Sequence, residues 1–129
     1  MIGYVTLGTN DLAKARDYYD ALLGSIGARR LMEFDEGFTL YGTGWGQPGV
    51  AITPPYNGQP AVAGNGNMVA IVFDTRDKVD AFYAKGIELG GSDEGPPGLR
   101  GPEGDRAFYG AYFRDPEGNK LCAFRVGSA

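Results

Sequence analysis

The feature that most constrains this sequence is an internal repeat with a period close to half its length. When the first half is shifted by 64 residues, similar residues coincide at four places. These are Tyr4 with Met68, Tyr18-Tyr19 with Phe82-Tyr83, Leu23 with Ile87, and Gly27 with Gly91. Each half reads as a strand, a helix and a run of strands, which is typical of a duplicated module. We therefore predict one domain over residues 1–129, with module one at about 1–55, a connector at 56–66 and module two at about 67–129.

Hydrophobic periodicity places the elements of both modules. In module one we predict a helix at about 12–26 and strands at 2–8, 30–34, 38–41 and 49–53. In module two we predict a helix at about 76–88, strands at 68–74, 107–114 and 120–126, and a long flexible loop at 94–104. Thr9, Asn10 and Asp11 are suitable N-cap residues for the first helix, and Asp74 or Thr75 for the second.

The stretch from Phe113 to Val126 predicts a tight hairpin. Pro116 has its φ fixed near the value needed early in a type I turn, and Asp115 can accept a backbone hydrogen bond there. Gly118 supplies the left-handed residue that lets the chain re-enter the sheet. Along the second strand, Cys122 shares one face with Phe124 and Val126.

Two stretches carry a family resemblance: Tyr4-Val5-Thr6-Leu7 followed by Asn10-Asp11-Leu12, and Asp115 to Leu121. In this order and spacing the chain resembles the vicinal oxygen chelate superfamily, which includes glyoxalase I, extradiol dioxygenases and bleomycin-resistance proteins. The resemblance covers essentially the whole chain. It implies an α+β fold of two βαβββ modules forming a curved, barrel-like mixed sheet around a cleft. It also implies a homodimer.

The metal enzymes of that superfamily bind a divalent ion through His, Glu or similar ligands on the first and last strands of each module. The resemblance transfers these ligand positions to Tyr4, Met68 and Cys122, and the last strand of module one lies near 50–52 without His or an acid. A neutral phenol, a thioether and a single thiol are an incomplete ligand set for any of the usual metals. We therefore predict no metal and no cofactor.

Without a metal, the predicted cleft has aromatic walls suited to a planar or partly aromatic small molecule. The candidate ligand-binding residues are Tyr4, Trp45, Met68, Tyr109, Tyr112, Cys122 and Phe124. A bulge near Gly110 would reverse which residues of 108–113 face inward, so their direction stays open. Arg100 and Arg106 flank the predicted loop and could clamp an anionic group, although solvated loop charges are the commoner case.

Composition excludes several classes of function. The 129 residues carry a formal net charge of −4 without a basic stripe, which disfavours nucleic-acid binding. No apolar stretch is long enough for a membrane span, and the first residues lack the pattern of a signal peptide. The single cysteine fits a reducing compartment, so we expect a cytoplasmic protein. There is no histidine, which removes the usual general base near neutral pH.

The sequence therefore favours a glyoxalase/bleomycin-resistance-like protein that binds a small organic molecule in a metal-free cleft. Two alternatives remain open at this point. One is a glyoxalase-like lyase or isomerase, related to lactoylglutathione lyase, with an atypical metal site. The other is a non-catalytic structural or interaction module whose cleft is filled by its own side chains.

Overall fold

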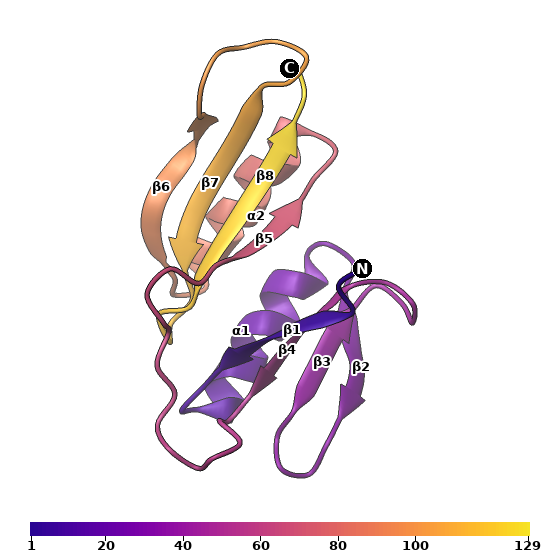
Figure 1. Ribbon diagram of the computed structural model, residues 1–129, viewed down its shortest axis with the longest axis vertical. Helices are drawn as coiled ribbons and strands as arrows, with labels where there is room; N and C mark the ends of the chain where they lie inside the picture. Colours follow the sequence, from indigo (N-terminus) through magenta and orange to yellow (C-terminus); the bar gives the residue numbers. More distant parts are fainter. The chain divides into compact units, whose positions relative to one another are not determined.

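The computed structural model describes residues 1–129, which divide into two compact units. Unit 1 comprises Met1–Asn65 together with Glu117–Asn119, and unit 2 comprises Gly66–Pro116 together with Lys120–Ala129. Each unit holds one βαβββ module with its own four-stranded mixed sheet (Figure 1). The predicted α+β class is confirmed, and so is the predicted order of elements except for one further strand in unit 2.

Unit 1 contains β1 (Tyr4–Gly8), α1 (Leu12–Gly24), β2 (Arg29–Glu33), β3 (Thr39–Gly42) and β4 (Gly49–Thr53). Its sheet has the order β1-β4-β3-β2, with β1 and β4 parallel and the other pairs antiparallel. Asp11 is the N-cap of α1, and its Oδ1 accepts a hydrogen bond from the Lys14 N–H at 3.1 Å. This bond satisfies one of the free N–H groups that every helix start leaves.

Unit 2 contains β5 (Val69–Val72), α2 (Arg76–Glu88), β6 (Ser92–Leu99), β7 (Phe108–Arg114) and β8 (Lys120–Val126). The order β5-β8-β7-β6 repeats that of unit 1, with a parallel β5–β8 pair. The two helices follow the 64-residue repeat at both ends: α1 begins at residue 12 and ends at 24, and α2 begins at 76 and ends at 88. Thr75 is the N-cap of α2 and accepts from the Lys78 N–H.

The prediction of a loop at 94–104 is wrong for residues 94–99. Residues 92–99 form β6, the edge strand, which pairs with β7 through register shifts on both sides of Gly95. Prolines at 96 and 97 are tolerated there because an edge strand has no second neighbour to receive their missing N–H bonds. A segment rich in glycine and proline is therefore a strand because β7 offers it backbone partners.

In each unit the helix covers one face of the sheet, and the core lies between them (Figure 1). In unit 1 the Tyr19 and Leu22 side chains of α1 are buried with Tyr41 and Ile52 of the sheet. In unit 2 the rings of Phe73, Phe82 and Phe113 pack edge to face or tilted at centroid distances of 5.3 and 5.8 Å. Neither helix is long and apolar enough to cross a membrane.

The turn between β7 and β8 has the predicted left-handed residue, since Gly118 has a φ of +101°. The adjacent turn residues belong to unit 1. Glu117 accepts hydrogen bonds from the Thr9 hydroxyl and from the Asn10 backbone N–H, at 3.1 and 2.9 Å. Asn119 donates from Nδ2 to the Gly8 carbonyl at 3.0 Å. These bonds give Glu117 and Asn119 a structural role at the end of β1.

Candidate functional site

Strand register decides which side chains share a face in unit 2. The pairing of β7 with β8 runs without a shift from Phe108 opposite Val126 to Arg114 opposite Lys120. Gly110 therefore causes no bulge against β8, and alternation applies throughout β7. The face turned away from α2, here called the distal face, carries residues of β5, β7 and β8. They are Ala70, Val72, Phe108, Gly110, Tyr112, Arg114, Lys120, Cys122, Phe124 and Val126.

Tyr112 is the centre of the distal face. The Arg100 guanidinium lies 5.4 Å from the centroid of its ring, and the Lys120 ammonium lies 5.5 Å from it. Both distances are within the range of a cation–π interaction. The ring is half-buried, and burial is the main cause that raises the pKa of Tyr112 above its usual value. The phenol therefore stays protonated at neutral pH beside two positive charges.

Cys122 lies opposite Tyr112 in the β7–β8 pair and is only 1% exposed. Burial raises the pKa of the Cys122 thiol, while the Tyr112 hydrogen bond and the Arg100 and Lys120 charges act in the opposite direction. Burial is the largest of these causes. The group is thus a protonated thiol, which is neither a good nucleophile nor a good metal ligand.

Phe108 and Phe124 add a second aromatic surface to the distal face. Their rings are parallel within 6°, with centroids 5.3 Å apart. Gly110 makes this arrangement possible, because a Cβ at this position would lie 2.7 Å from Cε1 of Phe108. The missing side chain lets the Phe108 ring lie over the backbone of β7.

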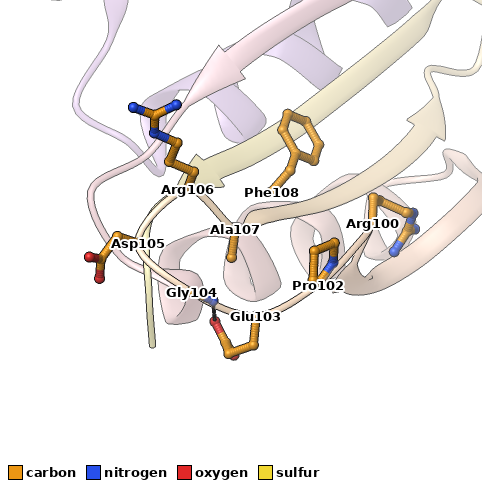
Figure 2. A pocket seen from close by; sticks show the side chains of 8 residues that line it. All are labelled: Arg100, Pro102, Glu103, Gly104, Asp105, Arg106, Ala107 and Phe108. Atoms are coloured by element: carbon orange, nitrogen blue, oxygen red, sulfur yellow. Dashed lines mark hydrogen bonds between the residues drawn. The ribbon is translucent and has the colours of Figure 1, made fainter.

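The segment between β6 and β7 forms a pocket of about 440 Å³ at the start of β7. Its lining comprises Arg100, Pro102, Glu103, Gly104, Asp105, Arg106, Ala107 and Phe108 (Figure 2). Figure 2 shows the Arg106 and Phe108 side chains on one side of the backbone and Ala107 on the other. Glu103 is bound to Arg76 of α2, which fixes the segment to the helix. The volume is within the range of small-molecule pockets.

The structure brings together four of the seven predicted ligand-binding residues. Tyr112, Cys122 and Phe124 lie on the distal face, and Met68, 45% exposed, directly precedes β5 with the parity of Ala70. Tyr109 lies on the opposite face, where its hydroxyl donates to Asp80 of α2 at 2.7 Å and its ring lies under Arg76. The ligand-binding role of all seven stays a prediction.

The remaining two candidates belong to unit 1. Tyr4 is 54% exposed on β1, and its ring contacts Phe38 edge to face at 5.7 Å. Trp45 is 67% exposed in the loop between β3 and β4. Sequence reasoning left the direction of Phe108 open and missed Lys120 as a member of the distal face. A signal for Lys120 was present, because it lies two residues before Cys122 on the same strand and so shares its face.

The residues at the superfamily's metal positions do not fit a metal ion. Strand register makes Ala51 of β4 the counterpart of Cys122. Ala51 pairs with Thr6 and Cys122 pairs with Ala70, and Thr6 and Ala70 are 64 residues apart, which is the period of the repeat. The four positions thus hold Tyr4, Ala51, Met68 and a protonated Cys122, which include no carboxylate or imidazole. No group of three or more cysteine, aspartate or glutamate side chains has a spacing that could hold a metal. No step of a mechanism can be derived through a metal from these donors.

The fold and these strand motifs define the class of the protein. The chain matches the family model of the Glyoxalase/Bleomycin resistance protein/Dioxygenase superfamily over residues 1–123. It belongs to this superfamily, as the resemblance implied. Among curated proteins, none matches the chain.

Solved structures of the same superfamily resemble the chain over nearly its full length. A glyoxalase/bleomycin resistance protein from Albidiferax ferrireducens T118 is 39% identical, with a TM-score of 0.83 and coverage of 97% of this chain and 98% of that one. A glyoxalase/bleomycin resistance protein/dioxygenase family enzyme from Burkholderia phytofirmans PsJN is 19% identical (TM-score 0.74, coverage 96% and 97%). A lactoylglutathione lyase from Agrobacterium tumefaciens is also 19% identical (TM-score 0.67, coverage 97% and 92%). At such low identity, the last two show a shared fold alone.

Proposed function

We propose that this protein binds a small planar or partly aromatic organic molecule on the distal face of unit 2, without a metal and without chemical conversion. The observation that carries the proposal is the pair of aromatic surfaces on one sheet face, Tyr112 and the stacked Phe108 and Phe124. Rings that are partly exposed on a rigid sheet bury apolar area on a ligand with little loss of conformational entropy.

The partial exposure of the aromatic rings supports a small ligand. Tyr112, Phe108 and Phe124 are each half-buried, so part of every ring is in contact with protein and part remains accessible. Cys122 forms an apolar floor beside Tyr112. A planar guest would therefore meet a flat aromatic surface with a few polar groups at its edge, which is the usual composition of a small-molecule site.

The chemistry of the same face supports binding without conversion. The thiol of Cys122 is protonated and has no histidine to activate it. The metal positions lack charged ligands, so the lactoylglutathione lyase chemistry named for one structural relative has no donor set here. We further propose that the protein works as a homodimer in the cytoplasm, on the support of the superfamily resemblance and the single cysteine.

An uncharged probe, 2-naphthalenemethanol, tests the proposed function. We expect its addition to shift backbone amide resonances of β7 and β8 in ¹H–¹⁵N spectra. Replacing Tyr112 by leucine, the residue at the matching place in unit 1 (Leu40), should weaken binding by about fivefold, because a stacked ring contributes about 1 kcal/mol.

Tyr109→Leu is the matched control, because Tyr109 lies on the same strand but faces α2. It should leave probe binding unchanged. Shifts confined to unit 1, or equal losses in the two variants, would contradict the assignment of the site. A stoichiometric metal in the purified protein that is lost in Cys122→Ala would favour the lyase alternative. Absence of any shift at saturating probe would favour the structural module.

A further inference from the structure

Two basic side chains lie against the Tyr112 ring of the distal face, although the chain as a whole has a net charge of −4. Of the other arginines of unit 2, Arg76 is paired with Glu103 and Arg114 with Glu94, whereas Arg106 and Arg125 form no salt bridge and do not lie over this ring. Arg100 and Lys120 form no salt bridge. Their positive charges are therefore available to a ligand.

The Arg100 guanidinium is held in place before any ligand arrives. Its Nη2 donates to the carbonyl of Pro96 at 2.7 Å, which folds the side chain back along β6. Glycines make room for it, because a Cβ at Gly95 or Gly98 would lie 3.1 or 3.3 Å from its terminal nitrogens. The Tyr112 ring is 5.4 Å from the guanidinium carbon. A guanidinium fixed in this way still has further N–H groups for an anionic oxygen and loses little entropy when it binds.

Lys120 brings a second positive charge to the same ring, with its Nζ 5.5 Å from the Tyr112 centroid. Both charges act on the Cys122 thiol below, so a positive potential reaches the floor of the site. The Lys120 charge also acts weakly on the Glu94 carboxylate, but Glu94 is bound to Arg114. Asp93, beside it on β6, accepts from the Tyr83 hydroxyl of α2.

We propose that Arg100 and Lys120 make the distal face of unit 2 selective for planar aromatic anions, with the ring on Tyr112 and the Phe108–Phe124 surface and the carboxylate or sulfonate between the two cations. This inference rests on the proposed binding function and names its ligand class. A carboxylate can accept two parallel hydrogen bonds from a guanidinium, whereas a cationic ligand meets two like charges.

Three probes of one shape test the selectivity: 2-naphthoate, 2-naphthalenemethanol and 2-(aminomethyl)naphthalene, at neutral pH. We expect 2-naphthoate to bind about tenfold more tightly than the alcohol, since a charge-assisted hydrogen bond contributes more than a neutral one. The amine should bind no more tightly than the alcohol. The preference for 2-naphthoate should fall between about 50 mM and about 500 mM NaCl, because salt screens exposed charges.

The double variant Arg100→Gln/Lys120→Gln should lose the preference for 2-naphthoate and keep the affinity for the alcohol. Arg106→Gln is the matched control. Arg106 lines the neighbouring pocket, but unlike Arg100 and Lys120 it does not lie over the Tyr112 ring. Unchanged amide spectra without ligand would show that both variants are folded.

The outcomes separate the two proposals. If the alcohol binds on the distal face but 2-naphthoate binds no more tightly, the anion selectivity is wrong and the proposed function stands. If none of the three probes binds, the proposed function itself fails. An equal loss of preference in Arg106→Gln would place the anion in the loop pocket and overturn the role of Arg100 and Lys120.

Discussion

The two units have the same module, yet they fill the space between helix and sheet differently. Strand register makes Tyr41 of unit 1 the counterpart of Phe113 of unit 2. Tyr41 pairs with Val50 and Phe113 pairs with Leu121, which are equivalent residues in the repeat. The Tyr41 hydroxyl donates to Asp20 at 2.8 Å, and Asp20 is also bound by Arg30. Phe113 has no hydroxyl, and its ring instead lies against Gly86 of α2. Unit 1 thus has a polar network at the edge of its core, whereas unit 2 has ring packing.

The distal faces differ in the opposite sense. Unit 1 has Leu40 and Ala51 where unit 2 has Tyr112 and Cys122. At these two matching positions, unit 1 has aliphatic side chains, whereas unit 2 has a phenol beside two positive charges and a thiol. A duplicated module can conserve its backbone while the side chains on one sheet face differ between the copies, because the two faces of a strand vary independently.

The largest expected effect concerns the Gly86–Phe113 contact. In Gly86→Ala the new Cβ would lie 2.4 Å from Cε2 of Phe113, so the ring or the helix must move. Overpacking of this kind should lower the free energy of unfolding by about 2 kcal/mol despite the better helix propensity of alanine. Urea unfolding measures the loss.

Gly24→Ala in α1 is the matched control, because a Cβ there meets nothing within 4 Å. It should be neutral or stabilise by up to about 1 kcal/mol. Adding Phe113→Leu to Gly86→Ala should recover part of the lost stability, because the smaller side chain vacates the contact. If Gly86→Ala is as harmless as Gly24→Ala, the two cores do not differ in the way described.

A smaller effect is expected for the buried hydroxyl of unit 1. Tyr41→Phe gives unit 1 the ring that unit 2 has and removes the hydrogen bond to Asp20. We expect a loss of about 1 kcal/mol in the free energy of unfolding. Tyr83→Phe removes an exposed bond to Asp93 and should cost no more than about 0.5 kcal/mol. Equal losses in the free energy of unfolding of the two variants would mean that burial of the Tyr41 hydroxyl does not strengthen its hydrogen bond.

The smallest effect is a difference in acid stability. The hydrogen bond from Arg30, followed by that from Tyr41, holds the pKa of Asp20 below its usual value of 3.8. The unfolded chain therefore takes up the proton first, so Asp20 contributes stability above about pH 4 that is lost as the pH falls through its folded pKa. Asp20→Asn should flatten the decline of stability between about pH 5 and pH 2.

Thermal unfolding of wild type and Asp20→Asn across this range measures the difference. Other carboxylates with lowered pKa values, such as Glu94, act equally in both proteins and cancel. Arg30→Gln should flatten the same part of the profile, since Arg30 is the largest cause of the Asp20 shift. Profiles that stay parallel to wild type in both variants would show that the network does not couple folding to this proton.

Features that depend on neighbours along the chain could be predicted from the order of residues alone. The repeat and the left-handed Gly118 were predicted, and the caps Asp11 and Thr75 were among the two or three adjacent residues predicted for each helix start, because capping and turn formation need only a few adjacent residues. The incomplete metal-ligand set was also visible, because it depends on residue type at known positions.

Features that depend on strand pairing could not be predicted in this way and became clear from the folded chain. The fold made 92–99 a strand, because β7 supplies hydrogen bonds that compensate for glycine and proline. It placed Tyr109 and Tyr112 on opposite faces, since register settles a parity that the sequence left open. It also folded Arg100 back over Tyr112, where the space left by two glycines and a carbonyl of its own strand fix the charge. Such contacts join residues that lie apart along the chain, and local sequence patterns carry no information about them.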